Sequence, residues 1–151
     1  MRVDPRNRLT GTDSKPRLGR EVLEIRRRVL GPEHPLTLRA MSNLSDSLTE
    51  LGNWVEAEKL LRQALNIQRR VLAPDHPDTA LSTYNLACVL AHQGKEAEAL
   101  SMLRDSVDHG LALWVVREMD KDPDLISLHG DPRFDALVAY ANNRASSAFK
   151  K

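Results

Sequence analysis

Two histidines are the first residues of this sequence whose type and surroundings suggest chemistry. His34 and His76 each lie between an acidic residue and a proline. A metal site would need ligands that converge on one point. Helix packing should hold these two about 10 Å apart, so we expect each histidine to order a turn before a helix, with metal binding as the alternative.

The nucleophilic side chains show no catalytic pattern. Cys88 is the only cysteine, so neither an internal disulfide nor a cysteine metal cage can form. Its place within a predicted helix, without an activating neighbour, favours a packed hydrophobic role over a nucleophilic one. Serine, histidine and aspartate are present, but no nucleophile elbow or other catalytic spacing joins them. We therefore predict no enzyme activity, no cofactor and no metal.

The composition narrows the possible partners and the location. Hydrophobic residues make up 41% of the chain and charged residues 28%, which is typical of a folded protein. The low aromatic content of 4% and the net charge of +1 argue against a nucleic-acid partner. No apolar run approaches the ~20 residues that span a bilayer, and the sequence does not begin with a signal peptide. These features and the lone cysteine predict a cytoplasmic protein without a membrane partner.

The elements that would position any site come from an internal repeat of about 42 residues. Sliding the chain by that length aligns roughly 18 identical residues in about 40 positions without a gap. The aligned pairs include the two histidines and, further on, Asn43 and Asn85. Such self-similarity predicts a repeat array in which each unit contacts only its neighbours.

Each unit is predicted to contain two helices joined by a glycine turn. Pro35 and Pro77 suit a first helical turn, while Gly52 and Gly94 end the first helix of each unit. Apolar residues three or four positions apart mark the buried faces. The predicted helices lie at residues 17–30, 36–51, 54–72, 78–93, 95–109, 111–119 and 132–146. The side chains expected between them are Leu44, Leu48, Leu61, Leu65, Leu86, Leu90 and Leu103.

These elements predict an all-α fold, an antiparallel helix-pair solenoid with a short C-terminal helical cap. Residues 1–16 are polar and are expected to form a disordered tail. Residues 17–110 form the repeats, as a half unit followed by two complete units. Residues 111–147 form the cap, in which Trp114 is expected to pack rather than to bind a ligand, and residues 148–151 are expected to fray.

The repeat resembles a known family. Residues 29–37, Val-Leu-Gly-Pro-Glu-His-Pro-Leu-Thr, recur at 71–79 as Val-Leu-Ala-Pro-Asp-His-Pro-Asp-Thr, and an Asn-Leu pair follows each copy. With the recurring Gly-x-x-x-Glu-Ala element, they resemble the long tetratricopeptide repeats of the kinesin light chain type. The resemblance covers about residues 17–110. It implies a right-handed superhelical solenoid that binds a protein or peptide in its concave groove.

The C-terminal segment carries a second resemblance. Residues 122–125, Asp-Pro-Asp-Leu, and 128–134, Leu-His-Gly-Asp-Pro-Arg-Phe, are similar to a closing segment of many bacterial tetratricopeptide proteins. Some of those proteins carry a kinase domain upstream. The sequence has no kinase Gly-rich loop, catalytic-loop His-Arg-Asp or Asp-Phe-Gly. An alternative function is therefore a detached regulatory region of a bacterial signalling enzyme, such as a serine/threonine protein kinase.

Asn43 and Asn85 are the main candidates for ligand binding. In the repeats that this sequence resembles, the matching asparagine faces the groove and bonds the backbone of a bound peptide. An amide has both a donor and an acceptor, so it can bond an extended chain of any sequence. A structural asparagine bonded to the neighbouring helix is the alternative. Helical geometry places the other candidate peptide-binding residues on the same face: Arg39, Ser42, Asp46, Tyr84, Cys88 and His92.

Three functions remain open from the sequence. The first is a non-catalytic scaffold that binds a peptide in the groove, with Tyr84 stacked on the ligand. The second is the regulatory region described above. The third is homo-oligomerisation through the unpaired helix at residues 17–30, which lacks a first-type partner helix.

Overall fold

The chain is helical along nearly all of the described part. The computed structural model describes residues 11–148, and these residues form no strand. The elements are α1 (Gly11–Leu30), α2 (Pro35–Glu50), α3 (Trp54–Val71), α4 (Pro77–His92), α5 (Glu96–Asp108), α6 (Leu113–Glu118), the 3-10 helices η1 (Met119–Lys121) and η2 (Pro123–Leu128), and α7 (Pro132–Ala148).

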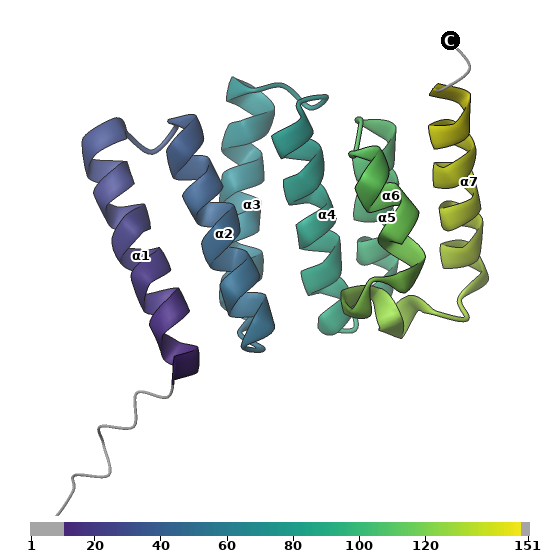
Figure 1. Cartoon of the computed structure of the whole chain (residues 1–151), viewed down its shortest axis with the longest axis horizontal. Helices are drawn as coiled ribbons and strands as arrows, with labels where there is room; N and C mark the ends of the chain where they lie inside the picture. Colours follow the sequence, from purple (N-terminus) through teal and green to yellow (C-terminus); the bar gives the residue numbers. More distant parts are fainter. Residues whose placement is uncertain (1–10, 149–151) are drawn as a thin grey trace, which may run out of the picture.

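The helices stand side by side in chain order, from α1 at one end to α7 at the other (Figure 1). The long helices pack mainly against their neighbours in sequence, α1 on α2, α2 on α3, α3 on α4 and α4 on α5. The pairs α2–α3 and α4–α5 correspond to the two complete units of the repeat. The predicted all-α helix-pair solenoid is therefore confirmed.

The two histidines order the turns that begin α2 and α4. Each precedes a proline at the first helical position and is extended in backbone conformation. The ring Nδ1 of His34 accepts a hydrogen bond from the Leu36 amide at 3.2 Å, and His76 accepts one from Asp78 at 3.1 Å. Each ring thus satisfies an amide that the helix itself cannot, which is the role of an N-cap side chain. The structural role expected for these histidines is confirmed.

Glycines set the turn inside each unit. Gly52 and Gly94 have φ of 76° and 71°, in the left-handed region where a side chain is disfavoured. The turns between units use the same conformation, at Gly31 (φ 93°) and, one repeat later, at Ala73 (φ 81°). The sequence predicted the glycine turns, and Ala73 is a departure that the structure adds.

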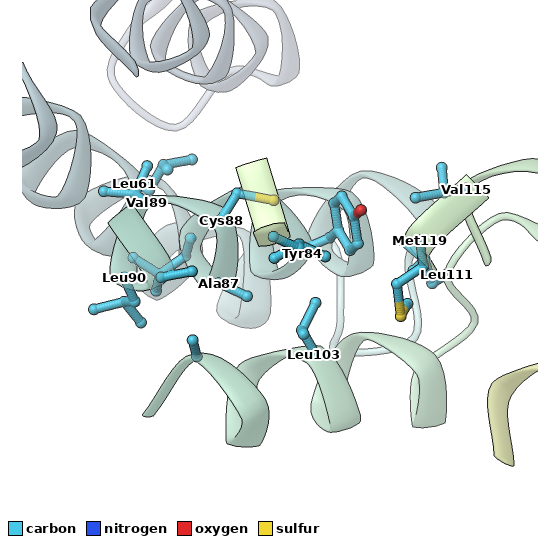
Figure 2. Close-up of a cluster of buried hydrophobic side chains, with 14 of the residues drawn as sticks. Leu61, Tyr84, Ala87, Cys88, Val89, Leu90, Leu103, Leu111, Val115 and Met119 are labelled. Atoms are coloured by element: carbon cyan, nitrogen blue, oxygen red, sulfur yellow. The ribbon is translucent and has the colours of Figure 1, made fainter. Parts of the chain in front are cut away.

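The core is a continuous layer of leucines and alanines between consecutive helices. All the leucines expected to be buried are buried, and Leu48, Leu61 and Leu90 have no exposed surface. Ala57 and Ala99, at matching places in the second helix of each unit, are also fully buried. Figure 2 shows part of this layer, with Leu90 and Ala87 of α4 facing Leu103 of α5.

The N-terminal flank differs from the sequence prediction. Helix α1 begins at Gly11, not near residue 17, so residues 11–16 are helical where a disordered tail was expected. Residues 1–10 and 149–151, where disorder and fraying were expected, lie outside the described part of the chain. In the cap, residues 123–128 form a 3-10 helix that packs on α4 and buries Leu125 and Leu128.

Truncating a core leucine should test the repeat register. Leu86 is 2% exposed, so Leu86→Ala should lower the free energy of unfolding by about 2–5 kcal/mol. Val55 is 77% exposed, and Val55→Ala should change it by less than about 0.5 kcal/mol. Urea unfolding followed by circular dichroism measures both. An unchanged unfolding midpoint for Leu86→Ala would contradict the register.

Replacing the strained alanine should stabilise the protein. Ala73 adopts the left-handed conformation that its counterpart Gly31 adopts without steric cost. We expect Ala73→Gly to raise the free energy of unfolding by about 0.5–1 kcal/mol, since the relief of about 1–2 kcal/mol exceeds the entropy cost of glycine. Gly31→Ala should lower it by a similar amount. Thermal unfolding of both variants checks the pair, and equal signs would contradict the explanation.

Candidate binding groove

Three adjoining recesses lie between α2, α4 and the C-terminal cap, and we call them together the groove. The acidic recess has a volume of about 220 Å³. Its carboxylates are Asp46 and Glu50 of α2 and Asp122 and Asp124 of the cap. The remaining wall is neutral, from Thr49, Tyr84, Asn85 and Cys88. No lysine or arginine lines this recess in the described part of the chain.

The other two recesses extend the groove on either side. The Gln68 recess, about 170 Å³, shares Asp46 with the acidic recess and is also lined by Arg39, Asn43 and Asp78. The Trp114 recess, about 370 Å³, shares Tyr84, Asn85 and Asp122 with the acidic recess. It is more apolar, because Leu81, Trp114, Val115 and Pro123 line it. Trp114 is 69% exposed, so a ligand can reach its ring.

The cap closes the end of the groove by bonding to α4. The Tyr84 hydroxyl donates to Asp122 Oδ2 at 2.5 Å, and His92 Nε2 lies 2.9 Å from Asp124 Oδ1. The Ser127 hydroxyl donates to the Ala91 carbonyl at 3.3 Å. These contacts lie along α4 from Tyr84 to His92 and hold the two cap aspartates beside the carboxylates of α2.

Burial and the neighbouring carboxylates raise the pKa values of two groups in the acidic recess. Removal of its carboxyl group from water, together with the negative charges of Glu50 and Asp124, raises the pKa of Asp46 from 3.8 to about 6. The residue as a whole is still exposed. Burial, and then the charges of Asp122 and Asp124, raises the pKa of the Cys88 thiol well above its usual value. The thiol therefore stays protonated, which is consistent with packing and not with nucleophilic attack.

The structure divides the residues predicted to bind a peptide into exposed and covered ones. Arg39, Asn43 and Asp46 are exposed on α2. Ser42 is half-buried, and its hydroxyl lies 3.1 Å from that of Ser82. These α2 residues all line the Gln68 recess.

The candidates on α4 are less accessible than expected. Tyr84 and Cys88 are each 5% exposed, and Figure 2 shows both within the buried cluster that extends to Val115 and Met119 of the cap. The expectation that Tyr84 stacks on a ligand is wrong, because the cap covers its ring and takes its hydroxyl. His92 is half-buried and stacks on Trp54, with ring centroids 5.2 Å apart.

Asn85 makes the contact of a structural asparagine and also lines the groove. It is half-buried and lines both the acidic recess and the Trp114 recess. Its Nδ2 donates to Asp46 Oδ1 at 3.0 Å, so it bonds the adjacent helix as a structural asparagine would. Asn43, one repeat earlier, has no such bond within the described residues and stays exposed.

The groove includes Asp122, Asp124 and Gln68, which were not predicted to line it. Asp122 and Asp124 come from the cap, whose path over α4 has no signal in the repeat pattern. Gln68 comes from α3, a second-type helix, and is 1% exposed. Its Oε1 is buried without a hydrogen-bond partner among the described residues. A buried polar residue on an otherwise apolar helix face was the one signal that could have singled out Gln68.

Comparison with known proteins agrees with this architecture. A family model described as tetratricopeptide repeat matches residues 17–69 and 42–109, which together cover more than half of the chain. The chain belongs to the tetratricopeptide repeat family. Repeats of this family generally mediate protein–protein interaction. None of the curated proteins compared with the chain matches it.

Membrane-spanning helices and clustered metal ligands are both absent from the described residues. None of their helices has the length and apolar character to cross a membrane. Nor do they contain a group of three or more histidine, cysteine or acidic side chains arranged to hold a metal ion.

The raised pKa of Asp46 makes a prediction about stability. A carboxyl whose folded-state pKa is raised adds stability at low pH, and this contribution is lost as the pH rises from 3.8 through about 6. Ionised Asp46 therefore destabilises the fold at pH near 7.5. Asp46→Asn should raise the free energy of unfolding there by about 1 kcal/mol, after a discount for exposure. Near pH 3.5 the variant and the parent should be about equally stable.

Urea titrations at the two pH values measure this difference. Asp75→Asn is the matched control, since the Asp75 side chain is 84% exposed in a turn and the same charge is removed. If Asp46→Asn gives the same difference at both pH values, the crowding of carboxylates does not destabilise the folded state.

Proposed function

We propose that this protein is a non-catalytic scaffold that binds a segment of a partner protein in the groove, and that the segment carries lysine or arginine next to an apolar residue. The observation that supports this most strongly is the acidic recess, where four carboxylates meet and no lysine or arginine of the described residues joins the lining. A cationic side chain would relieve their mutual repulsion, so charge complementarity favours a basic ligand.

The existing ion pairs neutralise the recess only in part. Lys15 reaches Glu50 at 3.4 Å, but both side chains are largely exposed, at 71% and 65%. Such a pair is weak and exchanges readily with a ligand cation. The ring of His92 contacts Asp124, with Nε2 2.9 Å from Oδ1. Among the described residues, Asp46 accepts a hydrogen bond from the neutral Asn85 amide. Burial, with the negative charges of Glu50 and Asp124, raises its pKa.

The neighbouring recesses suit the rest of such a segment. The exposed amide of Asn43 offers both a donor and an acceptor to an extended backbone. The unpaired Oε1 of Gln68 would accept a hydrogen bond from any donor that enters the Gln68 recess. On the other side, the Trp114 ring and Leu81 form a surface for an apolar side chain.

A peptide array graded in net charge tests this function. We expect the protein to retain basic peptides with an apolar residue and to release them as salt is added, because the attraction is electrostatic. The best peptide is then labelled and titrated by fluorescence anisotropy. Its affinity should fall as the pH drops from about 7.5 to 5, since Asp46 becomes neutral near its pKa of about 6.

Matched variants locate the binding. Glu50→Gln should weaken the basic peptide about threefold to tenfold, whereas the control Asp75→Asn should leave it unchanged. Asp46→Asn should remove most of the pH dependence. Equal retention of acidic and basic peptides, or equal effects of Glu50→Gln and Asp75→Asn, would contradict the proposal.

The regulatory-tail alternative stays a prediction, because it depends on the resemblance of residues 122–134 alone. A protein kinase encoded beside this chain would support it. Self-association is the alternative that a specific surface favours, and that surface lies on α1, away from the groove.

A further inference from the structure

One face of helix α1 is exposed, whereas the matching face of its counterpart α3 packs against the core. The two helices occupy the same place in the repeat, with Leu18 matching Leu60 and Ile25 matching Ile67. Leu60 and Ile67 are half-buried and pack against the core. Leu18 and Ile25 are 61% and 52% exposed. The repeat thus provides its own comparison: within residues 11–148, α1 packs mainly on α2, whereas α3 packs on both α2 and α4.

Three exposed residues and the half-buried Val22, which also packs against the core, form a regular seam. Leu18, Val22, Ile25 and Val29 are spaced by four, three and four positions, so they lie along one face of α1. Val29 is 68% exposed and Val22 is half-buried. This is the spacing at which two helices pack side by side through knobs and holes. The seam lies apart from Leu23, which α1 buries in the core.

Two unpaired charges lie beside the seam. Glu21 and Arg28 are seven residues apart, both exposed, and share one edge of it. Neither has a polar partner within residues 14–147. The other basic residues along this part of α1 are engaged: Arg20 bonds Glu56, Arg27 bonds Glu24, and Arg26 donates to the Leu36 carbonyl.

We propose that two copies of this chain associate by antiparallel packing of their α1 helices along this seam. A two-fold axis near the middle of the seam places Leu18 against Val29 of the second copy and Val22 against Ile25. The same axis brings Glu21 of each copy beside Arg28 of the other. The surface is therefore complementary to itself in both shape and charge, as a two-fold interface requires.

The antiparallel arrangement is the one that uses the free charges. In a parallel pair, Glu21 would meet Arg26, whose guanidinium already donates to the Leu36 carbonyl at 2.8 Å. The groove is lined by α2, α3, α4 and the cap, and none of its lining residues comes from the described side chains of α1. Pairing through the seam therefore leaves both grooves open and presents two of them in one assembly.

Sedimentation velocity of the full chain over a range of concentrations tests the pairing. The interface is short, so we expect a monomer–dimer equilibrium that shifts to dimer at high concentration. Val29→Glu should raise the dissociation constant about tenfold or more, because it places a charge in the seam. The control is Val71→Glu, the matching position of α3, which is 43% exposed and should leave dimerisation unchanged. Circular dichroism confirms that both variants are folded.

Charge reversal tests the orientation. Glu21→Arg and Arg28→Glu should each weaken the dimer, and the double variant should restore it, because the opposite charges are then exchanged. A double variant weaker than either single one would overturn the antiparallel arrangement. A parent chain that stays monomeric at every concentration, or a Val71→Glu effect equal to that of Val29→Glu, would overturn the seam itself. Peptide binding to the groove is measured separately, so its failure would leave this result intact.

Discussion

The structure depends on one constraint, that the long helices α1 to α5 bury their apolar faces mainly against the helices next to them in sequence. The core is a row of leucine and alanine contacts between consecutive helices, and no central core supports it from elsewhere. Every unit therefore stabilises the next, and the two ends of the row need separate solutions. The C-terminal end is covered by the cap, where Met119, Leu125 and Phe134 are buried. At the other end, α1 leaves a seam open.

The cap that covers the end of the row also decides the character of the groove. Burial of Leu125 and Leu128 brings η2 across α4, and this places Asp122 and Asp124 opposite the carboxylates of α2. The same packing covers Tyr84 and Cys88. Closure of the last unit by the cap thus creates an acidic surface and covers the Tyr84 ring. Burial of the Asp46 carboxyl, and then the charges of Glu50 and Asp124, raise its pKa.

Comparison of the two copies of the repeat distinguishes the features that every unit needs from those found at one position only. The histidine N-caps, the prolines after them and the threonine bonds from Thr37 and Thr79 to the turn before recur in both copies. They belong to the architecture. Differences between copies mark individual properties instead, as with Ala73 in place of glycine and with the exposure of Ile25 against Ile67.

The sequence by itself determined the helices, the turns and the buried leucines. The helices and turns follow from contacts within about one turn of helix, and the buried leucines follow from apolar spacing that recurs in both copies of the repeat. It also indicated which face of α2 would carry Arg39, Asn43 and Asp46. Only the tertiary structure decided which residues of the α4 face are covered. The bond from Tyr84 to Asp122 joins residues 38 positions apart, and no periodic pattern specifies such a contact. The acidity of the groove depends on that path, since helical periodicity shows which residues share a face but not what later packs against it.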